Sequence, residues 1–323
     1  MVVGRPQPPR MRTASEKLRK SKKQVSKMSR ITYRIFKDKM AGSVMAALTM
    51  AAILLVLVMA VELCVKSAPI LRHYSFWTLL TESQWKPMKG EFGFLPFIAG
   101  TFWCTVVAIV LALPVSLLMA VYLTEYARPQ LRTYAYPLLD ILAGLPSVIY
   151  GVWGSLLIVP WISHTVAPLV GKQSSGYTVL AGGIVLGVMI LPLLISLFME
   201  LFANVGNDLR EASTALGATR WQTVKHVVLR QSAPGMMAAI VLALSRTMGE
   251  TIAVLMVCGN LVIVPSSLLD ACYPIPALIA NNYGEMLSVP MYESALMLAA
   301  FLLFFLVVMM NIGSRIILKR VRS

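Results

Sequence analysis

Six long segments of the chain consist almost entirely of apolar residues. A membrane-spanning helix needs about 20 such residues, and lipid admits only helices or closed barrels, because every backbone polar group there must find its hydrogen bond inside the protein. The alternating pattern of barrel strands is absent. The sequence therefore predicts an all-α polytopic membrane protein with six transmembrane helices. Their expected ranges are 41–65, 95–123, 136–162, 178–202, 233–258 and 294–317.

The charged residues that remain are unevenly placed. They make up 13% of the chain, against about 25% in soluble proteins, and 13 of the 29 Lys and Arg residues lie in the first 39 positions. With alternate loops assigned to opposite sides, one side holds 23 basic residues and the other holds 5. The positive-inside rule then predicts cytoplasmic N- and C-termini. We expect a basic cytoplasmic tail over 1–40 and a six-span domain over 41–323.

Several classes of function lack their motifs. The net charge of +15 could suggest nucleic acid, but basic residues clustered beside a span are typical of membrane proteins, so no nucleic-acid partner is expected. No G-x-x-x-x-G-K-[ST] loop for ATP and no pair of hydrolytic carboxylates occurs. The four cysteines include no CxxC pair. The sequence predicts neither an enzyme nor a cofactor or metal site.

The loop over about 204–233 has a pattern of its own. Asp208 and Thr219 are expected to cap two short helices, with Gly217 breaking the chain between them. A plain amphipathic connector would also fit this shape. However, Glu211-Ala212-Ser213, then Gly217, Val227 and Leu229 at fixed spacing, resemble the E-A-A-x3-G-x9-I-x-L-P motif of ABC-importer permeases. Arg230 replaces the terminal proline of that motif.

This resemblance implies a role for the loop. In the family it docks in a groove of the ATPase subunit, so Glu211, Ala212 and Gly217 are expected to couple the chain to an ATPase.

The fifth apolar segment contains the only charged residues that the sequence places deep in the membrane. Arg246 and Glu250 are four positions apart, so a continuous helix would put them on one face. A charge at mid-membrane costs at least about 2.5–3.5 kcal/mol, so both should face the bundle interior or an aqueous path. A buried pair that merely fixes packing is the alternative. A guanidinium suits a phosphate-like oxyanion, and Glu250 would compete for it and prevent a permanent trap.

Further stretches resemble phosphate-specific ABC permeases, in particular their C-type subunit (PstC-like). They are 246–254 (RTMGETIAV) with Gly259-Asn260, 144–154 (GLPSVIYGVWG), 92–96 (FGFLP) and 122–125 (YLTE). The resemblance implies the type I, MetI-like permease fold. It also implies a subunit that imports inorganic phosphate across the cytoplasmic (inner) membrane, with Arg246 and Glu250 on the path. The implied partners are a second homologous permease, two ATPase subunits and an extracytoplasmic phosphate-binding protein.

Three other functions stay open from the residues alone. Charge cannot separate phosphate from sulfate, molybdate or phosphonate as the substrate. An ATPase-independent anion channel or carrier could use the same charged pair, although it would need no docking loop. A membrane scaffold or sensor subunit is the third possibility.

Overall fold

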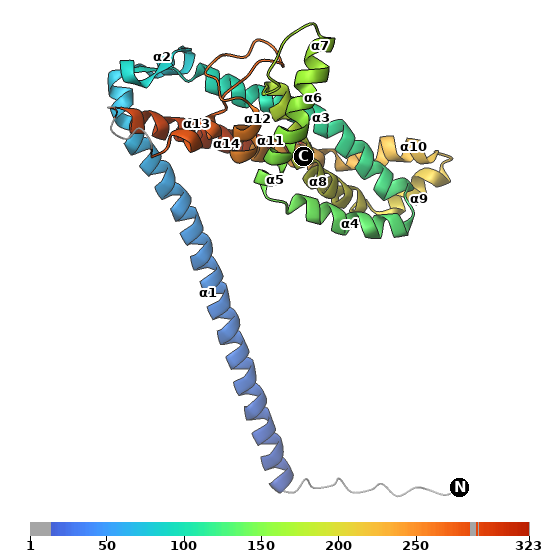
Figure 1. Cartoon of the computed structure of the whole chain (residues 1–323). Coiled ribbons are helices and arrows are strands. Elements are labelled where there is room, and N and C mark those ends of the chain that lie inside the picture. The colour runs from blue at the N-terminus through green and yellow to red at the C-terminus, as the bar shows by residue number, and fades with distance from the viewer. Residues whose placement is uncertain (1–13, 285–288, 290, 323) are drawn as a thin grey trace, which may run out of the picture. The chain divides into compact units, whose positions relative to one another are not determined.

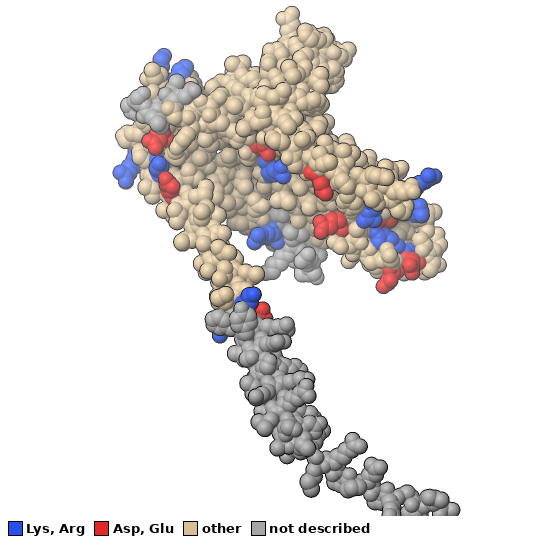
Figure 2. All heavy atoms as spheres, turned by 60° about the horizontal axis from the view of Figure 1, so that its bottom comes forward, with Lys and Arg blue, Asp and Glu red and all other residues tan. Residues whose placement is uncertain are grey.

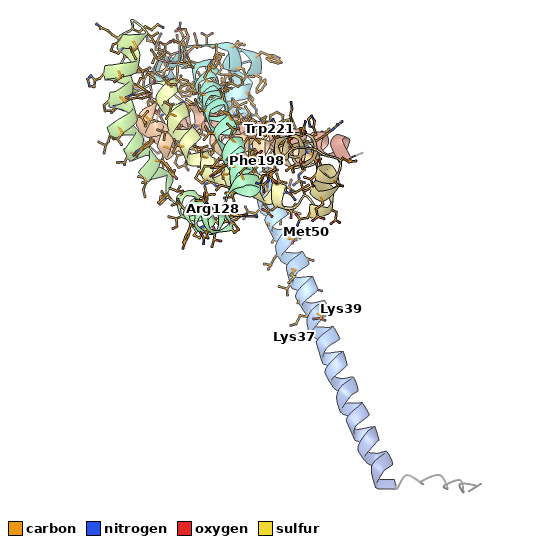
Figure 3. The ribbon with its side chains drawn as sticks, turned by 90° about the vertical axis from the view of Figure 1, so that its right-hand side faces the viewer. Lys37, Lys39, Met50, Arg128, Phe198 and Trp221 are labelled. Atoms are coloured by element: carbon orange, nitrogen blue, oxygen red, sulfur yellow. The ribbon has the colours of Figure 1, made fainter. Side chains whose placement is uncertain are left out.

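The computed structural model describes residues 14–284, 289 and 291–322, and it divides into two units, Met1–Val61 and Glu62–Ser323. Residues 1–13 of the expected basic tail lie outside the described residues, as do the side chains of 14–36. Helix α1 (Ala14–His73) has residues in both units, and the tail from residue 14 onward is helical. In the first unit, large apolar side chains such as Met50 are exposed beyond Lys37 and Lys39 (Figure 3), as expected of a helix that faces lipid.

The described residues of the second unit form helices, the loops that join them and a short hairpin. The hairpin pairs β1 (Trp85–Lys86) with β2 (Glu91–Phe92). Longer and shorter helices follow in chain order (Figure 1): α2 (Phe76–Thr81), α3 (Leu95–Val121), α4 (Pro129–Ala143), α5 (Ser147–Trp153), α6 (Val159–Trp161), α7 (Ala167–Leu169), α8 (Val179–Ala203), α9 (Asn207–Ala215), α10 (Arg220–Thr223), α11 (Leu229–Met248), α12 (Ile252–Val257), α13 (Ile275–Asn282) and α14 (Tyr292–Arg322). A 3-10 turn, η1 (Pro87–Lys89), joins the two strands, and four π-helical stretches interrupt the helices: η2 (Tyr122–Tyr126), η3 (Gly154–Ile158), η4 (Ile162–Val166) and η5 (Val224–Val228).

Six helices among the described residues are long and apolar enough to cross a membrane, as predicted. They cover Lys37–His73, Leu95–Tyr126, Ser147–Leu169, Val179–Ala203, Arg220–Met248 and Tyr292–Gly313. The fifth begins and ends earlier than its expected range of 233–258. The third begins later than its expected range of 136–162, because α4 ends at Ala143 and a new helix starts at Ser147. Pro146 causes the break, since proline disfavours the helical conformation of the residue before it.

Helices α3 and α8 form the centre of the second unit. Phe198 of α8 is completely buried (Figure 3). The two helices approach closely at Gly183, where an added Cβ would lie 2.3 Å from Val107 Cγ1. Gly183 thus allows these two helices to pack closely. Different parts of the chain lie at the two ends of the packed α3–α8 pair.

We call these two ends the hairpin end and the α9 end. At the hairpin end lie the β1–β2 hairpin and the loop 259–274, which bonds to the start of α8 through Val179 N–H···O Asp270 (2.9 Å). At the α9 end lie η2, α9 and α10, and α3 runs between the two ends (Figure 1). Figure 2 shows that charged side chains form small separate groups on the second unit, with wide uncharged surface between them.

Candidate functional site

The expected coupling residues lie on an exposed helix and turn at the α9 end. Glu211 and Ala212 are exposed on α9, and Gly217 follows with φ +84°, a conformation that favours glycine. Thr219 caps the next helix as predicted, in a capping box with Gln222. The expectation for Asp208 was wrong: α9 begins at Asn207 with Gly206 as its N-cap, so Asp208 lies in the first turn.

The second helix of this loop is not a separate element. The helical span Arg220–Met248 runs without a break through α10, η5 and α11. The π-helical stretch η5 ends directly before Leu229-Arg230, where the motif of the family has a leucine and a proline. A π-bulge can alter the path of a helix without proline, so η5 offers another means of bending where the motif has its proline.

An ion pair that the sequence did not indicate fixes α9 to the end of the second span. Arg210 Nη2 lies 2.8 Å from Glu125 Oε1, and both side chains are mostly buried, with 20% and 13% of their surface exposed. The same guanidinium donates to the carbonyl oxygens of Phe202 (2.7 Å) and Val205. Arg210 therefore ties together η2, the end of α8 and α9. The two partners are 85 residues apart, so no local pattern could have paired them.

A second contact holds α9 against α10. Ser213 Oγ lies 2.9 Å from Thr223 Oγ1, and Thr223 is buried. Ser213 stands where the family motif has alanine, so this departure from the motif supplies a hydrogen bond between the two helices.

Three apolar side chains project from the polar surface of this element. Leu209, Leu216 and Trp221 expose 47%, 90% and 53% of their surface (Trp221 in Figure 3). Exposed apolar side chains with a polar surround are typical of a protein-protein contact. The α9–α10 element is thus anchored to the rest of the second unit and exposes three large apolar side chains.

Arg246 and Glu250 lie at an interruption of the fifth span. A continuous helix over 233–258 was expected, but α11 ends at Met248 and α12 begins at Ile252. Gly249 N–H and Glu250 N–H close the end of α11 on the carbonyls of Arg246 (3.2 Å) and Thr247 (3.3 Å). The expectation of one helical face for both residues was therefore wrong. Arg246 belongs to the last turn of α11, and Glu250 to the link that follows.

The structure leaves Arg246 without a close acidic partner. Its side chain is exposed, Glu250 is half-buried, and the described residues contain no ion pair of Arg246. Arg246 is near enough to act electrostatically on both Glu250 and Tyr150. Because its donors are not used in a salt bridge, the guanidinium can accept an anionic ligand.

Two sequence stretches singled out separately meet at this interruption. Helix α5, from the stretch 144–154, packs on α12, from the stretch that contains Arg246. Gly151 permits the contact, since an added Cβ would lie 3.3 Å from Ala253 Cα and 2.8 Å from Met256 Sδ. The Tyr150 hydroxyl donates to Leu142 O at 2.8 Å, which holds that side chain across the break before α5. Helix α12, which follows the interruption after Arg246, thus packs on α5, which follows the break at 144–146.

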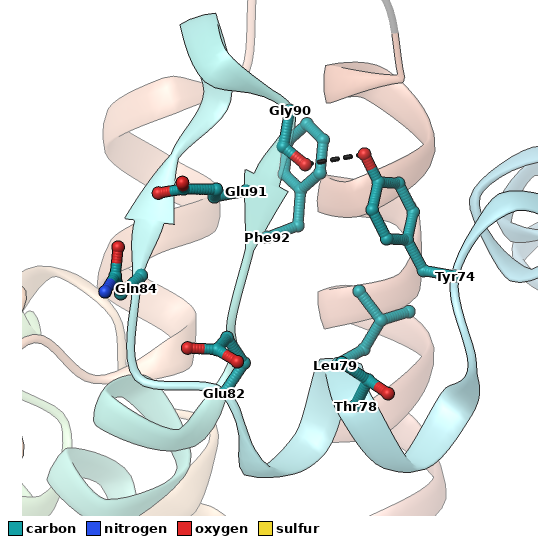
Figure 4. A pocket seen from close by; sticks show the side chains of 8 residues that line it. All are labelled: Tyr74, Thr78, Leu79, Glu82, Gln84, Gly90, Glu91 and Phe92. Carbon is teal, nitrogen blue, oxygen red and sulfur yellow. Dashed lines mark hydrogen bonds between the residues drawn. The ribbon is translucent and has the colours of Figure 1, made fainter.

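A pocket of about 280 Å³ at the hairpin end is chemically different. Its lining includes the carboxylates of Glu82 and Glu91, and the Tyr74 hydroxyl closes one side by donating to Gly90 O at 2.6 Å (Figure 4). The residues that line it include no Lys, Arg or His, so this pocket offers an oxyanion no cationic partner.

Comparison with known proteins agrees with this geometry. Residues 112–323 match the family described as the binding-protein-dependent transport system inner membrane component. The chain belongs to this family. It is therefore a multi-pass inner-membrane component of a transport system, and the permeases of such importers work with ATPase subunits and a binding protein.

Individual relatives extend the match beyond the family region. The phosphate transport system permease protein PstC of Xylella fastidiosa is 35% identical, over 74% of this chain and 77% of the relative. The protein of the same name from Mesorhizobium japonicum is 32% identical, over 87% and 91%. The chain thus covers most of the length of both.

Solved structures confirm the predicted fold. An inward-facing structure of the MetNI methionine ABC transporter matches 71% of this chain and 94% of its own, with a TM-score of 0.51 and 23% identity. A bacterial ABC transporter involved in import of the polysaccharide alginate covers 90% of this chain and 100% of its own, with a TM-score of 0.61 and 14% identity. The chain has the fold of the type I, MetI-like permeases.

Proposed function

We infer that the chain is the membrane subunit of an ATP-driven importer that moves inorganic phosphate across the cytoplasmic membrane. The observation that carries this inference is the exposed guanidinium of Arg246 at the interruption between α11 and α12, for which the part of the chain that the structure describes holds no ion pair. It lies in a chain that is 32–35% identical to permeases named for phosphate transport.

An arginine exposed on a membrane span must be covered in the working protein. Facing lipid would cost at least about 2.5–3.5 kcal/mol, so either water or another subunit has to lie against it. A second, homologous permease subunit meets this requirement if the two chains enclose a passage between them. Arg246 would then line that passage.

The charges of Arg246 and Glu250 explain how phosphate would be bound and released during transport. A planar guanidinium can bind two phosphate oxygens at once, while Glu250 offers an alternative partner for Arg246 nearby. Competition between carboxylate and phosphate keeps binding reversible. Import also requires that the passage bind phosphate differently in its two orientations, and that difference is supplied by the ATPase.

The α9–α10 element is the proposed contact for this ATPase. Leu216 and Trp221 would enter the groove of an ATPase subunit, with Glu211, Ala212 and Gly217 setting the shape of the element. Two ATPase copies would serve the two permeases, and an extracytoplasmic phosphate-binding protein would dock at the hairpin end. The distribution of basic residues, 23 against 5, supports cytoplasmic termini and a cytoplasmic α9 end. ATP hydrolysis would then belong to the separate subunit.

The test is uptake of labelled phosphate into vesicles that hold the complete complex. We expect uptake that requires ATP, the ATPase subunits and the binding protein, and that excess sulfate or molybdate does not suppress. Uptake without the ATPase would instead establish a channel or carrier. Suppression by another oxyanion would change the substrate, and unchanged uptake in cells lacking the chain would leave a scaffold role.

A further inference from the structure

Three cysteines meet in the interior of the second unit, at the hairpin end. Cys104 lies on α3, Cys258 caps α12, and Cys272 lies in the loop 259–274 (elements in Figure 1). All three are at most 1% exposed. Their positions are 154 and 168 residues apart for the pairs that involve Cys104, which is why the sequence, with no CxxC pair, predicted no site.

The three sulfur atoms are mutually close. Cys104 Sγ lies 3.7 Å from Cys258 Sγ and 3.5 Å from Cys272 Sγ, and all three sulfurs lie within 4.8 Å of one another. A thiolate binds a d10 metal ion at about 2.3 Å, so three sulfurs around one ion in a plane lie about 4.0 Å apart. The two distances from Cys104 need to lengthen by only about 0.3–0.5 Å to reach that geometry.

A disulfide fits this spacing less well. The S–S bond is about 2.0 Å long, so even the Cys104–Cys272 pair, at 3.5 Å, would have to close by roughly 1.5 Å. The distances therefore favour a bridging ion over a covalent bond.

The backbone around the sulfurs is fixed, and glycine makes their space. Cys272 N–H donates to Cys258 O at 2.9 Å, and Asn260 N–H donates to Cys272 O at 3.1 Å. On α8, an added Cβ at Gly182 would lie 2.5 Å from Cys258 Sγ and 3.1 Å from Cys104 Sγ. Any larger residue at position 182 would thus occupy the room that the sulfurs share.

The donor set selects the kind of ion. The group contains three thiols and, within the described residues, neither imidazole nor carboxylate. Soft sulfur ligands select soft ions such as Cu(I). Structural zinc takes four protein ligands, whereas this buried group offers three.

We propose that Cys104, Cys258 and Cys272 form a three-sulfur site for a soft monovalent d10 cation, with Cu(I) as its representative. Binding replaces thiol protons with the ion, one proton being released for each thiolate formed. The ion would join α3 to α12 and to the loop 259–274. The proposal does not depend on which substrate the transporter carries.

The test uses Cu(I), supplied without oxygen against a competing chelator, and the full chain in its detergent-solubilised complex. We expect one copper per chain and an X-ray absorption spectrum with three sulfur neighbours. Cys104→Ser and Cys272→Ser should each weaken binding at least tenfold. Cys64→Ser is the matched control, because Cys64 is exposed and far along the chain from the cluster, and it should bind like the unaltered protein.

The proposal fails if the unaltered complex takes up no copper, or if its spectrum shows nitrogen or oxygen neighbours in place of three sulfurs. It also fails if Cys104→Ser binds as tightly as Cys64→Ser, or if peptide mapping of the isolated protein finds two of the three cysteines in a disulfide. The spectrum of the unaltered chain decides the question even where a serine variant does not fold.

Discussion

Arg210 and Arg246 are two arginines in opposite structural situations. Arg210 is mostly buried, pairs with Glu125 at 2.8 Å and donates to two carbonyl oxygens. Arg246 is exposed, and the described residues hold no ion pair for it, although Glu250 lies close along the chain. The Arg210 guanidinium is thus bonded within the protein, whereas the described residues offer the Arg246 guanidinium no ion pair.

This difference distinguishes Arg210, whose bonds fix the local structure, from Arg246, which can bind an anion. A satisfied guanidinium gains nothing from an added anion, because that anion would have to displace existing bonds. For Arg246, the described residues provide no ion pair that would offset the free-energy cost of a charge in a membrane span. We therefore expect Arg246 variants to lose transport and keep the fold, and Arg210 variants to lose stability or coupling.

Arg246→Gln should give the largest effect on function. Hydrogen bonds to a charged group contribute about 1.5–3 kcal/mol, so phosphate uptake should fall at least tenfold, while the thermal unfolding of the complex stays unchanged. Arg230→Gln is the matched control, because it removes an exposed arginine from the other end of the same helix. Full uptake by Arg246→Gln would remove Arg246 from the transport path.

Arg210→Ala should give the largest effect on stability. Removing one member of a buried ion pair leaves the other charge unpaired, which costs about 3 kcal/mol, and α9 loses its anchor to η2. We expect a lower unfolding temperature and ATP hydrolysis that no longer drives uptake. Lys86→Ala is the control, because the Lys86–Glu91 pair is 3.6 Å long and about half exposed, and such pairs contribute at most about 1 kcal/mol. Equal effects of the two variants would contradict the assigned role of Arg210.

The contrast also explains what the sequence could and could not predict. Six spans follow from apolar length alone, and the cap at Thr219 follows from local chemistry, so both were found. The break at 249–251 was missed because Gly249 is tolerated inside a membrane helix, whereas its position at the end of α11 depends on packing of α5 against α12. The Arg210–Glu125 pair and the three-cysteine cluster join residues far apart in the chain, and no spacing rule reaches that far.

Gly217→Ala should reduce phosphate uptake less than the arginine variants, through a change confined to the α9–α10 element. Gly217 has φ +84° with open space around it, so the cost is conformational strain, roughly 1–2 kcal/mol for a residue with a Cβ. Phosphate uptake should fall severalfold through weaker coupling. Gly206→Ala is the control for adding a methyl group without backbone strain, since Gly206 has φ −57° and also no neighbour within 4 Å. Gly217→Asn should recover part of the loss, because asparagine tolerates this conformation better than alanine.

Ser213→Ala should have the smallest effect of the series. It restores the alanine of the family motif but removes the 2.9 Å bond to Thr223 Oγ1, and a lost hydrogen bond of this kind costs about 1 kcal/mol. Thr214→Ala is the control, because the Thr214 hydroxyl bonds to carbonyls of its own helix, those of Arg210 and Glu211. If hydrogen exchange at α9 rises in Ser213→Ala and not in Thr214→Ala, the bond between helices holds the element in place. Equal exchange in both would assign that task to Arg210 alone.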